Sequence, residues 1–306
     1  MKKTAYIFPG QGSQYVGMGK DLYESNSAAR ELFQQADSIL GFSLSKICFE
    51  GPEEELKQTK NTQPAIFLHS IVLTKLMKES SATMSAGHSL GEYSALVFAK
   101  AISFEDGLKL VRLRGELMQH AGEQQQGTMA AVVGLESGIL NEVCTEASSV
   151  GIVQCANFNS PGQIVISGSV AGVKKAMELA KARGAKLVKE LVVSGAFHSP
   201  LMQSAKDGLK IALSSIIIND PEIPVYANVT GGAVQKAEEI RTLLADQLTS
   251  PVRWHETVEN MTNNGVQSFV EIGPGKVLQG LVKRINAGVE VSGVDKFQDI
   301  EKTVAA

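Results

Sequence analysis

The sequence predicts an α/β protein in which a larger part, built on a mostly parallel sheet, carries a smaller inserted part. Stretches typical of buried strands alternate with helical periodicity along most of the 306 residues. Two of the predicted strands end in glycine-rich turns, at residues 9–14 and 87–91. Between about 126 and 196 the order changes to strand, helix, strand, strand, helix, strand, which indicates a separate small unit.

The first predicted strand is the apolar run Ala5–Phe8, which leads into the first glycine-rich turn. A second strand ends at Ser85-Ala86-Gly87, directly before the other turn. Apolar residues at helical spacing predict four helices, at Ala28–Leu40, Pro64–Lys78, Glu92–Lys100 and Asp106–His120.

The inserted unit is predicted from six consecutive elements. They are Met129–Val133, Ser137–Ala147, Val153–Asn157, Gln163–Ser167, Val170–Arg183 and Lys186–Val192. The tight connection Asn159-Ser160-Pro161-Gly162 predicts a hairpin between the two middle strands. This β-α-β-β-α-β order is the ferredoxin-like pattern. We therefore expect residues 126–196 to form a ferredoxin-like small subdomain.

The chain then returns to the larger part. A helix is expected after Pro200, a strand at Val225–Asn228, a helix around Glu238–Leu248 and a last strand at Ser268–Ile272 that runs into Gly273-Pro274-Gly275. The large subdomain is thus predicted to comprise residues 1–125 and 197–306.

Composition excludes several classes of protein. The formal net charge of -3 argues against a general nucleic-acid binder, which has a basic excess. No apolar run reaches the roughly 18 to 20 residues that span a bilayer. We expect no signal peptide, because residues 1–10 contain neither a long apolar region nor a small-residue cleavage site. Cys48, Cys144 and Cys155 are too scattered for a zinc site or a disulfide framework. We expect a cytoplasmic protein without a bound metal.

The turn Gly87-His88-Ser89-Leu90-Gly91 fits the G-x-S-x-G nucleophile elbow. In such an elbow a serine lies at a sharp strand-to-helix turn, and small neighbours are needed because the backbone is strained. The predicted strand before Ser89 and helix after it supply this context, so the large subdomain is expected to be α/β-hydrolase-like. The alternative is a glycine-flanked turn with a capping serine.

A nucleophilic serine needs a base, because its free hydroxyl is unreactive near neutral pH. Of the five histidines, His69 falls in an apolar helix, His120 and His255 in polar surroundings, and the His88 side chain should point away from its neighbour Ser89. His198 lies in a loop of small residues after a predicted strand. For His198 the role of general base is favoured only slightly over that of a structural loop histidine, because no Asp stands near it as an orienting group.

Six motifs follow one another in order and span essentially the whole chain. They are Phe8-Pro9-Gly10-Gln11-Gly12-Ser13-Gln14, Gly87-His88-Ser89-Leu90-Gly91-Glu92-Tyr93, Arg112-Leu113-Arg114-Gly115, Asn157-Phe158-Asn159-Ser160-Pro161-Gly162-Gln163, Gly195-Ala196-Phe197-His198-Ser199 and Glu271-Ile272-Gly273-Pro274-Gly275. Together they resemble the malonyl-CoA:acyl-carrier-protein transacylases of fatty-acid synthesis, a family that includes acyltransferase domains of polyketide synthases.

The resemblance implies a two-step ping-pong reaction. Ser89 takes the malonyl group from malonyl-CoA and passes it to the phosphopantetheine thiol of an acyl carrier protein. His198 would accept the serine proton and return it to each leaving thiol, and a backbone carbonyl near Gln247 would orient it. The backbone amides of Gln11 and Leu90 match the family's oxyanion-hole positions. No cofactor is implied, because the phosphopantetheine belongs to the carrier protein.

The same resemblance makes Arg114 the residue that binds the malonyl carboxylate, since a guanidinium can hold a carboxylate by two parallel hydrogen bonds. Without it, Arg114 would be taken for a surface arginine on an amphipathic helix. Arg112 should face elsewhere on that helix. Phe197 would restrict room at the malonyl α-carbon, and Asn157 and Asn159 are expected to bind substrate.

Other functions stay open at this point. A serine thioesterase or esterase would share the serine and its base, and a stand-alone acyltransferase of a polyketide synthase would differ only in its carrier protein. A non-catalytic carrier-docking module is disfavoured by the intact set of Ser89, His198 and Arg114. A monomer is expected by default.

Overall fold

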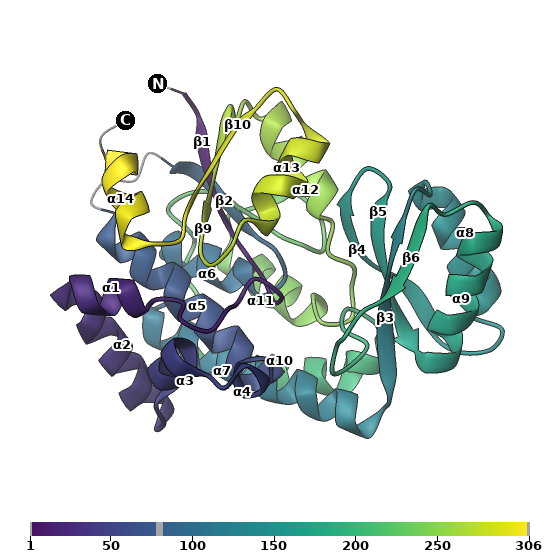
Figure 1. Ribbon diagram of the computed structural model, residues 1–306, viewed down its shortest axis with the longest axis horizontal. Helices are drawn as coiled ribbons and strands as arrows, with labels where there is room; N and C mark the ends of the chain where they lie inside the picture. Colours follow the sequence, from purple (N-terminus) through teal and green to yellow (C-terminus); the bar gives the residue numbers. More distant parts are fainter. Residues whose placement is uncertain (1, 78–81, 305–306) are drawn as a thin grey trace.

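The computed structural model describes residues 2–77 and 82–304, whose strands form two sheets (Figure 1). The larger sheet has the strand order β10-β9-β1-β2-β7-β8. Its strands are parallel except β8, which pairs antiparallel with β7 at one edge. The strands are β1 Thr4–Phe8, β2 Ala82–Gly87, β7 Val225–Tyr226, β8 Ala233–Val234, β9 Ser268–Ile272 and β10 Glu290–Val294.

Strand β1 explains why this sheet is covered on both faces. All five of its residues are buried, and successive side chains point to opposite faces. Tyr6 and Phe8 pack into one hydrophobic core, whereas Ala5 and Ile7 pack into a second core on the opposite face of the sheet. The continuous apolar run in the sequence is therefore that of a central strand in a parallel sheet.

The helices of the larger part lie around this sheet (Figure 1). They are α1 Lys20–Ser25, α2 Ser27–Leu40, α3 Leu44–Glu50, α4 Glu53–Leu56, α5 Thr59–Leu76, α6 Gly91–Phe98, α7 Phe104–Gln124, the short 3-10 helix η1 Pro200–Met202, α10 Gln203–Ser215, α11 Ala237–Asp246, α12 Trp254–Asn263, α13 Val277–Ile285 and α14 Phe297–Val304. None of the helices in the described residues is both long and apolar enough to cross a membrane.

The smaller sheet is antiparallel, with the order β4-β5-β3-β6. Its strands are β3 Gly127–Val133, β4 Val153–Ser160, β5 Gln163–Ser169 and β6 Leu187–Glu190, and its helices are α8 Ser137–Ala147 and α9 Val170–Ala182. This order and connectivity are ferredoxin-like, as predicted. Both helices lie on the outer side of the sheet, away from the larger part (Figure 1). We keep residues 126–196 as the proposed extent of this subdomain.

The prediction that Ser268–Ile272 is the last strand was wrong, because β10 follows it and pairs parallel with it. Strand β10 lies at the sheet edge, and its sequence contains Gly293, which weakens the strand pattern. A Cβ at Gly293 would lie 2.2 Å from Nε2 of Gln279 on α13, so the end of that flexible side chain would have to move to accommodate a larger residue.

Several helices were also missed, namely α1, α3, α4, α12, α13 and α14. The first three are too short, at 6, 7 and 4 residues, to establish a periodic pattern. The predicted helix Pro64–Lys78 begins earlier, at Thr59, and its last residue, Lys78, lies outside the described residues.

Gly91→Ala tests how closely α6 crosses the end of β1. A Cβ at Gly91 would lie 2.0 Å from the carbonyl oxygen of Phe8, a backbone atom that cannot move aside on its own. We expect a loss of about 3 kcal/mol in the free energy of unfolding, the upper part of the range for overpacking, measured by urea denaturation. Gly280→Ala is the control: Gly280 lies inside helix α13 with nothing within 4 Å of the added Cβ, so the protein should gain up to about 1 kcal/mol. Equal stability of the two variants would contradict the prediction.

Candidate active site

The turn at residues 87–91 is a strained connection between β2 and α6. Ser89 has a φ of 52°, in the left-handed region that side chains other than glycine rarely adopt. Gly87 permits the turn, because a Cβ there would lie 1.8 Å from the backbone carbon of Gly91. The nucleophile-elbow geometry therefore depends on both glycines of the motif, and the strain is located at the serine itself.

Ser89 and His198 are in hydrogen-bond contact, although 109 positions separate them in the chain. The distance from Ser89 Oγ to His198 Nε2 is 2.8 Å. His198 Nδ1 lies 2.8 Å from the carbonyl oxygen of Gln247. Because a carbonyl oxygen only accepts, Nδ1 must carry the proton, and Nε2 is left to accept the serine hydroxyl hydrogen.

The environment of His198 keeps its ring neutral. The residue is 3% exposed, and burial, followed by the positive charge of Arg114, lowers the pKa of His198 to about 3. Both effects disfavour the imidazolium. His198 is thus available as a proton acceptor throughout the physiological pH range.

Arg114 lies beside the serine rather than on the surface of α7, and its side chain is fully buried. Its Nη2 donates to Ser89 Oγ at 3.1 Å and to Gln247 Oε1 at 2.8 Å, while Nη1 donates to Gln63 Oε1 at 2.8 Å. The guanidinium carbon also lies 5.6 Å from the ring centroid of Tyr93. A guanidinium has five N–H donors, so donors remain for a further ligand.

Gln247 joins these groups through both its backbone and its side chain. Besides accepting from Arg114, the side chain donates from Nε2 to Glu92 Oε2 at 2.7 Å and to the Ser89 carbonyl oxygen at 3.1 Å. Glu92 is only 3% exposed. Burial raises the pKa of Glu92 to about 7, although hydrogen bonds from Asn228 and Gln247 and the charge of Arg114 oppose that rise.

The backbone N–H groups around Ser89 have different partners. The amide of Ser89 donates to Asn228 Oδ1 at 2.6 Å, which removes it as a donor for a ligand. Among the described residues, the amides of Leu90 and Gln11 donate no hydrogen bond. Both residues line the same cavity as Ser89.

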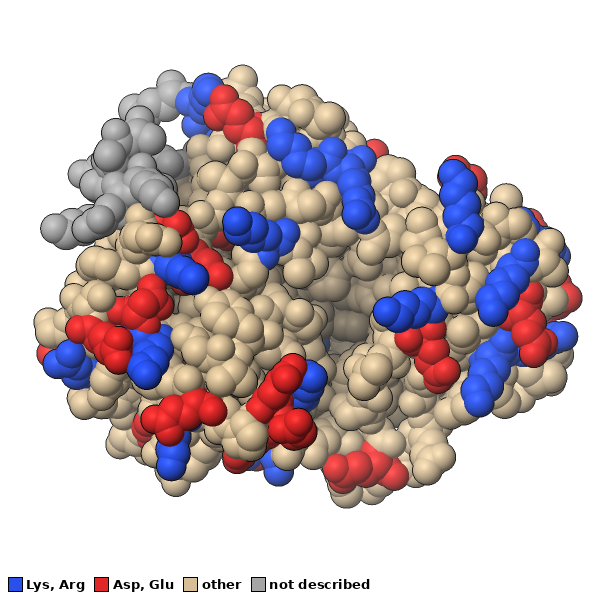
Figure 2. All heavy atoms as spheres, viewed as in Figure 1, with Lys and Arg blue, Asp and Glu red and all other residues tan. Residues whose placement is uncertain are grey.

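This cavity has a volume of about 270 Å³ and opens between the two subdomains. In Figure 2 the surface is hollowed between the larger part, on the left, and the smaller part, on the right. The larger part contributes loop 10–13, the elbow, Arg114 and α13 to the cavity wall. The smaller part contributes β3, β4 and β5.

The remaining predicted residues also line the cavity. Phe197, Asn157 and Asn159 all contribute to its wall. The Asn159 side chain lies 2.9 Å from His88 Nε2, so the His88 ring is turned away from the Ser89 hydroxyl. Within the described part of the chain, no group of three or more His, Cys, Asp or Glu side chains is placed to hold a metal ion.

Comparison with known proteins identifies the family. The model of the acyl transferase domain family matches residues 5–296. A malonyl CoA-acyl carrier protein transacylase of Bacillus subtilis is 47% identical over 99% of this chain and 97% of its own length.

The chain belongs to the acyl transferase family.

Solved structures agree with this assignment. An acyl carrier protein S-malonyltransferase from Vibrio cholerae superposes on this acyl transferase with a TM-score of 0.95 at 43% identity, covering 98% of this chain and 99% of the other. A malonyl-transacylase in complex with its holo type II polyketide synthase acyl-carrier protein has a TM-score of 0.96 at 41% identity, covering 99% of both chains. The fold class predicted from the sequence is that of these malonyltransferases.

Several residues that contact the candidate catalytic groups of this acyl transferase were not singled out from the sequence, among them Gln63, Glu92 and Asn228. Asn228 could have been found, because it is the last residue of a predicted strand, at the edge of the parallel sheet where ligands bind. Glu92 stands within the quoted Gly87–Tyr93 motif, but its burial is a tertiary property. Nothing in the sequence around Gln63 marks it as a partner of Arg114.

Replacing Glu92 by Gln should alter how stability depends on pH. Between pH 4.5, the ordinary pKa of Glu, and about 7, the unfolded chain has lost the Glu92 proton while the folded protein retains it. The free energy of unfolding therefore falls as pH rises through this interval, by at most about 3 kcal/mol for this group. Glu92→Gln cannot titrate, so its stability should fall less between pH 5 and pH 8 in urea denaturation.

Glu222→Gln is the matched control, since the Glu222 carboxylate is exposed and pairs with Lys100 on the surface. It should keep the pH dependence of the parent protein. If Glu92→Gln and the parent lost the same free energy of unfolding over this pH range, Glu92 would not retain its proton in the folded state.

Proposed function

We propose that this acyl transferase moves the malonyl group of malonyl-CoA to the phosphopantetheine thiol of an acyl carrier protein through a malonyl-Ser89 intermediate. The observation that carries the proposal is the distance of 3.1 Å between Arg114 Nη2 and Ser89 Oγ. A malonyl group has a free carboxylate one methylene away from its thioester carbon. A buried guanidinium beside the nucleophile therefore fits this acyl group better than acetyl, which has no charge to bind.

In the first half-reaction, Ser89 Oγ attacks the thioester carbon while His198 Nε2 accepts the hydroxyl proton. The negative charge that develops on the thioester oxygen would be stabilised by the amides of Gln11 and Leu90, which have no other acceptor among the described residues. His198 then returns the proton to the departing coenzyme A thiol. The Gln247 carbonyl, on His198 Nδ1, holds the required tautomer throughout.

In the second half-reaction, the phosphopantetheine thiol replaces coenzyme A. His198 accepts the thiol proton, and the thiolate attacks the malonyl-Ser89 ester in the same oxyanion hole. Collapse of the tetrahedral intermediate forms the new thioester and breaks the ester. The proton on His198 returns to Ser89 Oγ, so one set of residues serves both directions.

The cavity wall fits a short acyl group. We infer that Phe197, which is 6% exposed and borders His198, limits the space at the malonyl α-carbon. Asn157 and Asn159 would contact the pantetheine arm or the thioester from β4. Monomeric state and cytoplasmic location stay predictions from the sequence.

Two alternatives differ in the acceptor. The carrier could belong to polyketide rather than fatty-acid synthesis, since the complex reported above pairs a relative with a polyketide synthase carrier protein. A hydrolase would transfer the malonyl group to water. Incubation with malonyl-CoA, with and without carrier protein, separates transfer from hydrolysis, because steady malonate release that the carrier does not affect would favour hydrolysis.

Intact-mass analysis after exposure to malonyl-CoA tests the intermediate. We expect a malonyl adduct on the parent protein and none on Ser89→Ala, because Ser89 is the only serine of the described residues that has both a base and a carboxylate-binding cation in contact. A malonyl adduct that persisted in Ser89→Ala would refute the assignment of the nucleophile.

Arg114→Ala tests acyl specificity. Loss of two charge-assisted hydrogen bonds, at roughly 1.5–3 kcal/mol each, should lower kcat/KM for malonyl-CoA by at least about 100-fold. The value for acetyl-CoA should change far less. Arg112→Ala on the same helix is the control, because Arg112 contacts Glu116, the Lys60 carbonyl oxygen and Asn61 instead. It should leave the malonyl-to-acetyl preference as it is, and equal losses for both substrates in Arg114→Ala would rule out the carboxylate-binding role.

A further inference from the structure

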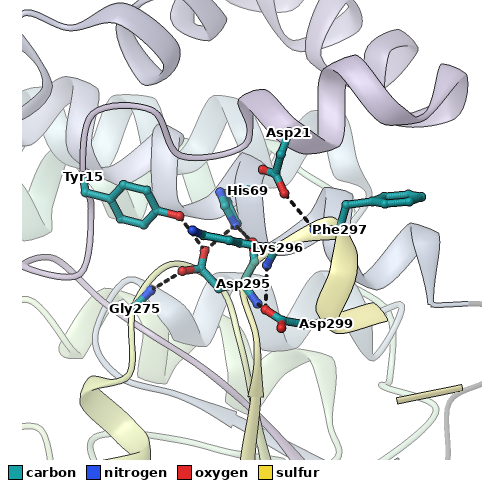
Figure 3. A network of polar contacts seen from close by, with 8 residues as sticks. All are labelled: Tyr15, Asp21, His69, Gly275, Asp295, Lys296, Phe297 and Asp299. Atoms are coloured by element: carbon teal, nitrogen blue, oxygen red, sulfur yellow. Dashed lines mark hydrogen bonds and ion pairs between the residues drawn. The ribbon is translucent and has the colours of Figure 1, made fainter. Parts of the chain in front are cut away.

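Asp295, the first residue after β10, lies at the centre of a polar network outside the cavity (Figure 3). Its carboxylate Oδ1 accepts a hydrogen bond from the Tyr15 hydroxyl at 3.0 Å and lies 3.2 Å from His69 Nε2. Its Oδ2 accepts from the Gly275 amide at 3.2 Å. One carboxylate thus joins the loop after β1, helix α5 and the loop after β9.

The partners of Asp295 favour a fixed, ionised carboxylate. His69 is 1% exposed, and its Nε2 also lies 2.8 Å from the Asp295 carbonyl oxygen. Burial alone would raise the pKa of Asp295, but the contacts with His69, the Gly275 amide and Tyr15 outweigh it and lower the pKa below its ordinary value. Burial and the nearby Asp295 charge raise the pKa of Tyr15, so its hydroxyl stays protonated and donates.

The loop that Tyr15 anchors is the one that presents the Gln11 amide. Inside it, Ser13 Oγ donates to the Gly10 carbonyl oxygen at 2.8 Å, and the Gly12 amide donates to Gln14 Oε1 at 2.8 Å. These bonds fix the shape of the loop. They do not fix its position relative to Ser89, because both partners of each bond lie within the loop.

The turn at residues 273–275 lies against this loop. A Cβ at Gly273 would lie 2.6 Å from Pro9 Cγ, and one at Gly275 would lie 3.5 Å from the Ser13 carbonyl oxygen. The turn therefore packs against the loop on either side of Gln11. This gives a purpose to the Gly273-Pro274-Gly275 motif, which the chemistry at Ser89 does not use.

We propose that Asp295 is a positioning residue for the oxyanion hole. It holds the Gln11 loop through Tyr15 and holds the adjacent turn through Gly275. Its contact with the buried His69 fixes the carboxylate relative to α5. The inference rests on the proposed function, because it assumes that the Gln11 amide binds the oxyanion. A hole that is preorganised costs no rearrangement during the reaction. Asp295 does not line the cavity, whereas Arg114, proposed to bind the malonyl carboxylate, does.

Tyr15→Phe and Asp295→Asn test this role in the full-length protein. The rate of Ser89 acylation by malonyl-CoA is measured by rapid quench and intact mass, giving a maximum rate constant and a half-saturation concentration. We expect Tyr15→Phe to lower the maximum rate constant about 10-fold and Asp295→Asn to lower it at least as much, since an Asn side chain cannot accept from all the present donors. The half-saturation concentration should stay within about twofold.

Tyr226→Phe is the matched control. Tyr226 lies on strand β7, and its hydroxyl accepts a hydrogen bond from Asn264, away from this loop. It should acylate at the parental rate. The final adduct fraction of each variant reports how much of the protein is folded, and the rate constant is determined for that fraction alone. Partial unfolding therefore cannot imitate the effect.

An unchanged maximum rate constant in both loop variants, whatever their thermal stability, would reduce Asp295 to a structural residue and overturn the inference. A rise in half-saturation concentration at an unchanged rate constant would overturn it equally. Failure of the proposed function is a different result: the parent protein itself would then form no malonyl adduct on Ser89.

Discussion

The side-chain amide of Gln247 lies between the buried guanidinium of Arg114 and the buried carboxyl group of Glu92. It accepts from Arg114 Nη2 at 2.8 Å and donates to Glu92 Oε2 at 2.7 Å, while its backbone carbonyl faces His198 Nδ1. An amide can do this because it is both donor and acceptor. Without it, Arg114 and Glu92 would each lose one hydrogen bond, which is costly for a buried charged group. One residue thus contributes to both the histidine tautomer and the guanidinium orientation.

The larger sheet brings the other groups together. Strands β1, β2 and β7 are parallel neighbours, so their carboxyl ends lie at the same edge. The loops at that edge carry Gln11, Ser89 and Asn228. The small subdomain closes the cavity from the other side, and its β4 is fastened to the larger part by backbone hydrogen bonds at Val252. The same edge carries Asp295 after β10, which explains how a residue near the C-terminus can hold the loop after β1.

Local sequence was informative wherever a short-range rule operates. The strand-to-helix turn around Ser89 follows from its glycines, and helix α8 and strand β9 have the predicted bounds. The hairpin at Pro161-Gly162 and the order of the small sheet follow from spacing alone. Weak periodicity explains why the short helices near the N-terminus and β10 were missed, because an edge strand needs no continuous apolar pattern. It does not explain why α12, α13 and α14 were missed, since these helices are amphipathic. His198 could be selected only narrowly from its loop, and Arg114 only through the family resemblance.

The sequence by itself determined the fold class, the nucleophile elbow and the family, because each is written in contiguous residues or in an ordered set of motifs. Tertiary structure alone decided which distant groups meet. It buried Arg114 beside Ser89, left the Leu90 and Gln11 amides without an acceptor among the described residues, gave the Ser89 amide to Asn228, and joined Tyr15 to Asp295 across 280 positions. Burial and long-range hydrogen bonding arise from packing of the whole chain, and they are what set the ionisation of Glu92 and His198.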